Sequence, residues 1–183
     1  AHSKGVVHRD LKPSNLFLAS DAGGSVALKI LDFGVAKIGG ESADVTSTGV
    51  IVGTPAFMAP EQARGASSAD ARSDVYALGA VLYRLVTGQT PYGGSDASTT
   101  LIRLLEESPT RPSVVDKTVP AGLEAVIEKA MARDPGERYQ TAEELERALQ
   151  PFDEGSHQTM ATRTAAASDA QTALRTDLAA VNA

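Results

Sequence analysis

Residues 8–15, His-Arg-Asp-Leu-Lys-Pro-Ser-Asn, place four different ionisable side chains and an amide in one short stretch. An imidazole, a guanidinium, a carboxylate, an ammonium and an amide are costly to crowd together unless they share a ligand. Pro13 disfavours a helix through this stretch, so we expect a loop. A loop of this composition is a candidate site for chemistry on a charged substrate.

Two short apolar runs, residues 16–19 and 26–31, follow the loop, and residues 20–25 between them are rich in turn formers. This pattern predicts a β-hairpin. In a hairpin the residue before the first strand lies beside the residue after the second, and these residues are Asn15 and Asp32. An amide oxygen and a carboxylate, both hard ligands, suit a Mg²⁺ ion that is shared with substrate phosphates.

The eight residues 8–15, followed by Asp32-Phe33-Gly34, resemble the catalytic and metal-binding loops of eukaryotic-type (Hanks-type) protein kinases. The resemblance covers roughly residues 5–150, and residues 133–139 are most similar to bacterial serine/threonine members. It implies transfer of the ATP γ-phosphoryl group to serine and threonine hydroxyls of protein substrates. ATP and Mg²⁺ are the implied cofactors, with Mn²⁺ as a substitute.

The resemblance also implies a role for each residue of the site. Asp10 would be the catalytic base, and Lys12 would lie against the migrating phosphoryl group. Asn15 and Asp32 would hold Mg²⁺ next to the ATP phosphates. Phe17, together with Leu16 and Leu18, would lie under the adenine ring.

Further residues would support these groups without taking part in the chemistry. We expect His8 to pack near Phe33, and Gly34 to complete the metal-binding turn. Asp74 would brace the backbone of the catalytic loop, although a plain carboxylate at a helix N-terminus is the alternative. Glu61 and Arg138 would form a buried ion pair.

Residues 35–58 have no clear periodicity and lie where the family has its activation loop; a merely flexible loop is the alternative. Arg9, beside Asp10, would pair with a phosphate on this loop. Thr54 would belong to the substrate-binding shelf. The phosphorylation candidates are Thr46, Ser47 and Thr48.

The elements that position these residues are mostly helical. Residues 72–87 carry one charge after Asp74 and have apolar residues on every side, which predicts a buried central helix. Ser73 is the expected N-cap and Gly88 the expected stop. Shorter helices are expected over residues 97–107, 123–132 and 141–149, the last beginning with a Thr141–Glu144 capping box.

Composition limits the alternatives. The 183 residues are 42% hydrophobic and 22% charged, which is typical of a globular domain. A net charge of −6 argues against a nucleic-acid partner or a basic membrane contact, and the chain has no cysteine for disulfides or metal binding. No apolar run of about 18 residues is present. We therefore expect a cytoplasmic location.

The expected fold class is mainly α with a small β-hairpin: a protein-kinase-like C-terminal lobe, with the N-terminal lobe absent. Residues 1–152 would form this lobe, and residues 153–183 an Ala/Thr-rich disordered tail. No G-x-G-x-x-G motif occurs, and Lys29 is expected to be an outward-facing strand residue rather than the ATP-anchoring lysine. We expect the chain alone to be inactive, with the missing lobe as its partner. The alternative function is a non-catalytic lobe that docks substrates or partners.

Overall fold

The computed structural model describes residues 1–20, 26–32, 55–65, 69–94 and 96–153. The chain divides into two compact units, residues 1–145 and 146–183. The first unit carries every described residue of the candidate site. The described part of the second unit holds the end of helix α6 (Ala142–Leu149) and a 3₁₀ turn at Gln150–Phe152.

Strands β1 (Leu16–Ser20) and β2 (Val26–Ile30) form the expected antiparallel hairpin. The register pairs Leu16 with Ile30 and Ser20 with Val26. All five residues of β2 are exposed, including Lys29. Lys29 is therefore an outward-facing strand residue, as the sequence predicted.

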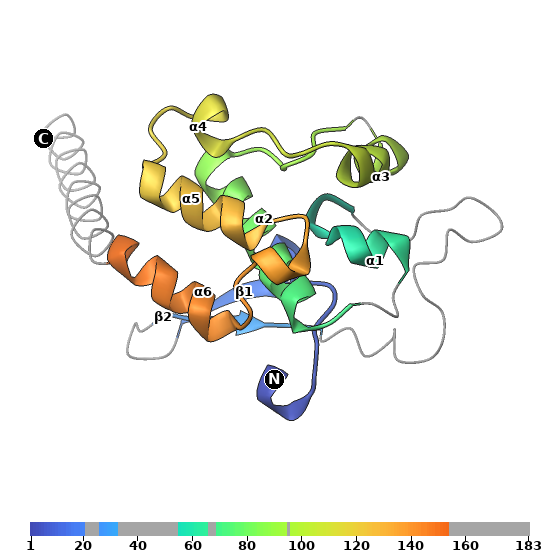
Figure 1. Ribbon diagram of the computed structural model, residues 1–183. Coiled ribbons are helices and arrows are strands. Elements are labelled where there is room, and N and C mark those ends of the chain that lie inside the picture. The colour runs from blue at the N-terminus through green and yellow to red at the C-terminus, as the bar shows by residue number, and fades with distance from the viewer. Residues whose placement is uncertain (21–25, 33–54, 66–68, 95, 154–183) are drawn as a thin grey trace, which may run out of the picture. The chain divides into compact units, whose positions relative to one another are not determined.

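Helices dominate the rest of the first unit (Figure 1). Single 3₁₀ turns occur at His2–Lys4, Pro13–Asn15, Pro55–Phe57 and Pro135–Glu137. The mainly helical fold with one small hairpin agrees with the expectation of a mainly α class with a small β-hairpin. The helices are α1 (Pro60–Arg64), α2 (Ala71–Thr87), α3 (Ala97–Glu106), α4 (Pro112–Val115), α5 (Ala121–Ala130) and the start of α6.

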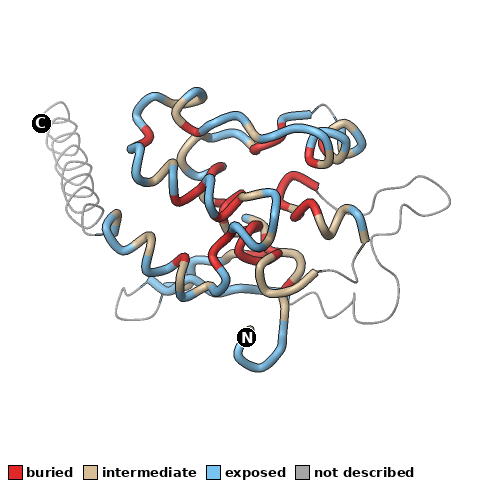
Figure 2. The backbone as a smooth tube through the Cα atoms, viewed as in Figure 1, coloured by how far each residue is buried: buried red, intermediate tan, exposed pale blue. Residues whose placement is uncertain are grey.

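Helix α2 is the centre of the core, and buried positions concentrate along it and the segments beside it (Figures 1 and 2). Tyr76 and Tyr83 on α2 are among the largest side chains that are almost fully buried. Helix α5 packs closely against α2 at Gly79, where an added Cβ would lie 2.8 Å from Met131 Cγ and 2.9 Å from Ala130 Cβ. Glycine is needed there because two helices cannot otherwise approach so closely.

The predicted N-cap of this helix was wrong. Helix α2 begins at Ala71, and the Asp70 carboxylate accepts a hydrogen bond from the Arg72 backbone N–H. Ser73 already lies within the first turn, where its hydroxyl donates to Glu61 instead. The predicted stop is confirmed, because Gly88 has φ 70° and its N–H donates to Arg84 O.

The other helices agree approximately with the expected ranges. Helix α3 begins after an Asp96 N-cap that accepts from Thr99 N–H, and α5 begins two residues before the expected start. Helix α6 shows half of the predicted capping box: Thr141 Oγ1 accepts from Glu144 N–H, but the Glu144 carboxylate accepts from Gln140 N–H. The sequence pattern did not predict helices α1 and α4. In the part of the chain that the structure describes, no helix has the length and apolar character needed to cross a membrane.

Candidate active site

The backbone of the predicted catalytic loop is held by one buried carboxylate. Asp74, on the first turn of α2, is 2% exposed, and its two oxygens accept the backbone N–H groups of His8 and Arg9, each at 2.8 Å. The partners are 66 and 65 residues away in sequence. Such charge-assisted hydrogen bonds are stronger than neutral ones. The central helix therefore determines the path of the loop.

Arg9 adopts an unusual backbone conformation with φ 64°. A left-handed conformation is unfavourable for a residue with a long side chain, and it persists only where the surroundings enforce it. Asp74 holds the Arg9 N–H, and Gln62 Nε2 donates to the Arg9 carbonyl at 3.0 Å. Gln62 Oε1 also accepts from Ala59 N–H at 3.1 Å, so one amide joins the start of α1 to the loop.

Two residues of this network were missed by sequence reasoning. His2 Nε2 lies 2.8 Å from Asp74 Oδ2, and Gln62 makes the bridge just described. Neither residue belongs to a motif that we interpreted, and both contacts join positions more than 50 residues apart. Only the folded chain shows that they support the loop.

Asp10, Lys12 and Asn15 form one cluster at the end of this loop. Lys12 Nζ lies 2.9 Å from Asp10 Oδ2. Asn15 Nδ2 donates to the Asp10 carbonyl at 2.8 Å and to Asp10 Oδ2 at 3.3 Å. The Asp10 side chain is 36% exposed, so a group approaching from solvent can reach it. The cluster thus presents a carboxylate and an ammonium side by side.

His8 connects the loop to the end of the hairpin. The Asp10 N–H donates to His8 Nδ1 at 3.3 Å, and His8 Nε2 lies 3.1 Å from Leu31 O. These partners assign the tautomer with the proton on Nε2. His8 is 3% exposed, in keeping with the expectation of a packed rather than a catalytic imidazole.

The hairpin register corrects one detail of the predicted metal site. Leu31, rather than Asp32, lies opposite Asn15, and the Leu31 N–H donates to Asn15 O at 2.8 Å. The prediction assumed that the second strand ended one residue later than it does. Asp32 follows with φ 52°, a left-handed conformation that aspartate tolerates better than most residues.

Glu61 and Arg138 form a two-point ion pair beneath the site. Arg138 Nη1 and Nη2 lie 2.7 Å and 2.8 Å from Glu61 Oε1 and Oε2, and the Ser73 hydroxyl donates to Oε1 at 2.7 Å. Burial alone would raise the pKa of Glu61, but the hydrogen bonds from Arg138 and Ser73 outweigh it, so the pKa is lowered. The Arg138 side chain is 0% exposed and also lies over the Tyr76 ring at 4.9 Å.

Phe17 lies on the opposite side of β1 from Leu16 and Leu18, because side chains alternate along a strand. Leu16 packs against the core, while Phe17 is 56% exposed. From the sequence we expected all three residues to lie under one adenine ring. Their alternation along the strand excludes this arrangement. Phe17 remains the candidate. Six other predicted site residues fall outside the described part of the chain: Phe33, Gly34, Thr46, Ser47, Thr48 and Thr54.

Among residues 1–20, 26–32, 55–65, 69–94 and 96–153, no group of three or more histidine, cysteine, aspartate or glutamate side chains is arranged to hold a metal ion. A site built from one amide and one carboxylate differs from a closed metal centre. It fits an ion whose remaining ligands come from water and from substrate phosphates.

The fold and this site define a protein kinase domain. The chain belongs to the protein kinase domain family, which it matches over residues 1–149. It is 43% identical over 150 residues to the serine/threonine-protein kinase Pkn1 of Myxococcus xanthus, covering 82% of this chain and 22% of that protein. It is 41% identical over 145 residues to the serine/threonine-protein kinase PknB of Mycobacterium leprae, covering 79% of this chain and 22% of that protein.

PknB of Mycolicibacterium smegmatis is 40% identical over 156 residues, covering 85% of this chain and 24% of that protein. These relatives are bacterial serine/threonine-protein kinases, which confirms the predicted family. The chain spans only about a quarter or less of their length.

Proposed function

We propose that this chain supplies the catalytic lobe of a serine/threonine protein kinase, corresponding to the C-terminal lobe of the domain. The observation that carries the proposal is the Asp10–Lys12–Asn15 cluster on a backbone that Asp74 and Gln62 hold in a strained conformation. Catalysis by positioning requires groups whose geometry is set before the substrate binds. A lobe used only for docking has no physical need for such an arrangement.

Asp10 accepts or orients the proton of the substrate hydroxyl. The hydroxyl oxygen forms a bond to the γ-phosphorus as the bond to the leaving ADP oxygen breaks, and the proton passes to the Asp10 carboxylate. Lys12, 2.9 Å from Asp10, places its positive charge next to the phosphoryl group as it moves. Its compact ammonium acts as a point charge.

Asn15 and Asp32 are the proposed ligands of Mg²⁺, or of Mn²⁺ in its place. When bound, the ion would neutralise charge on the ATP phosphates. The support is the chemistry of the donors and their placement at the open end of the hairpin. Asn15 donates to Asp10 through Nδ2, which leaves the amide oxygen on its other edge for an ion. Phe17 is the proposed apolar contact for adenine.

Arg9 is the proposed partner of a phosphate on the activation loop, at Thr46, Ser47 or Thr48. In the described part of the chain its guanidinium has no hydrogen-bond or ion-pair partner, and the hydrogen bonds of Arg9 are made by its backbone N–H and carbonyl alone. Thr54 remains the proposed shelf residue for the substrate. Substitution of all three phosphorylation candidates by alanine in an active protein should lower activity, and unchanged activity would contradict this part of the proposal.

We expect the 183-residue polypeptide alone to transfer phosphate poorly. It contains no glycine-rich loop to cover the phosphates, so water would weaken each electrostatic contact. Calorimetric titration with MgATP and a phosphate-transfer assay would test this. Micromolar affinity with turnover that depends on Asp10 would contradict it.

A chimera tests the catalytic proposal itself. The amino-terminal part of the kinase domain of Myxococcus Pkn1 would be joined to residues 1–153 of this chain. We expect phosphorylation of serine and threonine, but not tyrosine, in a generic protein substrate. A folded chimera that binds MgATP without turnover would favour the docking function instead.

A further inference from the structure

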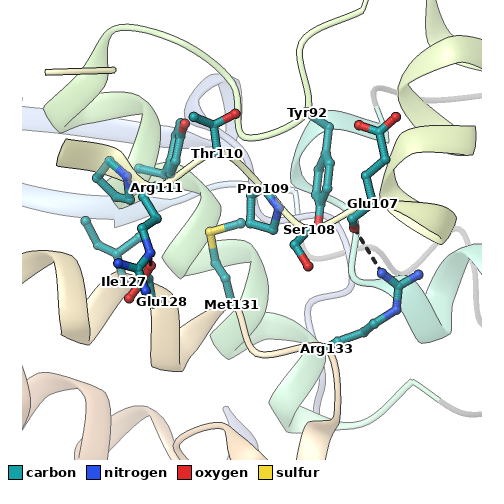
Figure 3. A pocket seen from close by; sticks show the side chains of 12 residues that line it. Tyr92, Glu107, Ser108, Pro109, Thr110, Arg111, Ile127, Glu128, Met131 and Arg133 are labelled. Atoms are coloured by element: carbon teal, nitrogen blue, oxygen red, sulfur yellow. Dashed lines mark hydrogen bonds and ion pairs between the residues drawn. The ribbon is translucent and has the colours of Figure 1, made fainter. Parts of the chain in front are cut away.

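A cavity lies on the first unit away from the candidate active site. Its volume is about 240 Å³. Tyr83 of α2, Ile127 and Met131 at α5, and residues 107–112 between α3 and α4 line it (Figure 3). Asp74, which holds the catalytic loop, and Tyr83 are nine residues apart on α2, or about 14 Å at the rise of an α-helix. The cavity is therefore a separate site.

Most of the lining is apolar. Ile127 is 1% exposed and Met131 is 4% exposed, and Figure 3 shows the end of the Met131 side chain directed toward Pro109. A buried apolar cavity of about 150 Å³ is large enough to bind benzene. The space here suits one ring or one apolar side chain.

The Tyr83 hydroxyl supplies the second observation. Tyr83 is 2% exposed and lines the cavity, and its hydroxyl has no hydrogen-bond partner in the described part of the chain. The hydroxyl is not among the polar atoms cut off from solvent, so it borders the open space. Buried tyrosine hydroxyls normally have a partner. A ligand that accepts a hydrogen bond would supply one.

The charges around the cavity balance. Arg111 Nε lies 3.2 Å from Glu128 Oε1, and both side chains are well exposed. Arg133 Nη1 donates to Glu107 O at 2.9 Å, a contact drawn in Figure 3. Two arginines and two glutamates leave no net charge on the lining. The cavity thus offers no electrostatic preference for an ion.

We propose that this cavity is a binding site for an uncharged, mostly apolar group about the size of one aromatic ring, which accepts a hydrogen bond from Tyr83. A small aromatic molecule and an apolar side chain of a protein segment, next to its own backbone carbonyl, share this chemistry. Benzamide represents the first source and N-acetyl-phenylalaninamide the second.

The test is a titration of the purified 183-residue chain with each probe, followed by NMR of the methionine methyl groups. The chain has three methionines, so the spectrum is simple. Met131 lines the cavity and Met58 does not, which makes Met58 an internal control. We expect saturable shifts of Met131 at millimolar benzamide, with Met58 unchanged. Stronger binding of N-acetyl-phenylalaninamide would identify a protein segment as the source.

Tyr83→Phe removes only the hydroxyl and should weaken benzamide binding about threefold to tenfold, the ratio that one hydrogen bond contributes. Tyr139→Phe, a tyrosine outside the cavity, should leave the affinity unchanged. Benzoate, with the same ring and a charge, should bind more weakly than benzamide. Three results would overturn the proposal. The Tyr83→Phe variant could bind benzamide as tightly as the wild type, Met58 could shift as much as Met131, or neither neutral probe could show saturable binding.

Discussion

The proposed catalytic loop and the β-hairpin meet at Asn15, yet they are held in different ways. In the loop, the backbone N–H groups of His8 and Arg9 donate to the buried Asp74 carboxylate, and Gln62 donates to the Arg9 carbonyl. The hairpin has apolar side chains on the surface, with Leu18 66% and Leu28 59% exposed. Phe17, Val26, Ile30 and Leu31 are also exposed.

This difference shows which half of the proposed site is organised by the described chain itself. A strained loop stays in place because several buried groups hold it. A two-stranded hairpin is marginally stable unless something packs against its faces. We therefore expect the base and the lysine to keep their geometry, and the nucleotide-facing side to depend on further packing.

The largest expected effect is a loss of turnover when the proposed base in the loop is replaced. Asp10→Asn in the active chimera should lower turnover by a factor of about 10²–10⁴, because an amide keeps the shape of the side chain but cannot take the proton. Steady-state kinetics would measure this change. Glu106→Gln, an exposed carboxylate outside the site, is the control and should have no effect. Near wild-type turnover of Asp10→Asn would mean that the base is misassigned.

The second largest effect is expected on the stability of the folded chain, through the Glu61–Arg138 ion pair. Glu61→Gln should lower the free energy of unfolding by about 3–5 kcal/mol, because it leaves the fully buried Arg138 guanidinium without its counter-charge. Urea unfolding would measure the loss. Adding Arg138→Met should recover part of it, and a double variant less stable than Glu61→Gln would contradict this explanation.

Low pH should remove the contribution that the ionised Glu61 makes to the free energy of unfolding. The pKa of Glu61 is lower in the folded protein than its ordinary value of 4.5. Its stabilising contribution is therefore complete above pH 4.5 and is lost as the pH falls through the folded-state pKa. Urea unfolding at several pH values should show the wild type and Glu61→Gln converging in acid. A constant difference would exclude Glu61 ionisation as the cause.

A smaller effect is expected at Gln62. Gln62→Ala removes the donor to Arg9 O and the acceptor for Ala59 N–H, so it should cost about 1–2 kcal/mol. Hydrogen exchange should become faster at the backbone amides of His8 and Arg9. Gln89→Ala, at an exposed position, is the matched control. Unchanged exchange at Arg9 would show that Asp74 alone holds the loop.

The smallest effect on stability is expected in the hairpin. Leu18 and Leu28 are cross-strand partners, and replacing both with threonine should change the free energy of unfolding by less than about 0.5 kcal/mol per site. Self-association, measured by light scattering, should decrease because exposed apolar area is lost. A fall in melting temperature of more than about 5 °C would show that these side chains are already buried against something.

Local patterns were enough to predict several elements. The turn formers between two apolar runs predicted the hairpin, and Gly88 marked the end of α2. Two errors concerned the ends of predicted elements. Ser73 has a suitable N-cap side chain, but its hydroxyl donates to Glu61, so Asp70 caps the helix instead. A strand end placed one residue too late put Asp32, rather than Leu31, opposite Asn15.

The sequence by itself determined the family and the order of the chemical groups, because residues 8–15 and 32–34 carry their chemistry in short spacings. Only the tertiary structure decided what holds those groups. The Gln62–Arg9 and His2–Asp74 contacts join positions 53 and 72 residues apart. The cavity at Tyr83 likewise needs three separate segments. Contacts of this kind depend on how the helices pack around α2, and no local pattern of residues encodes that packing.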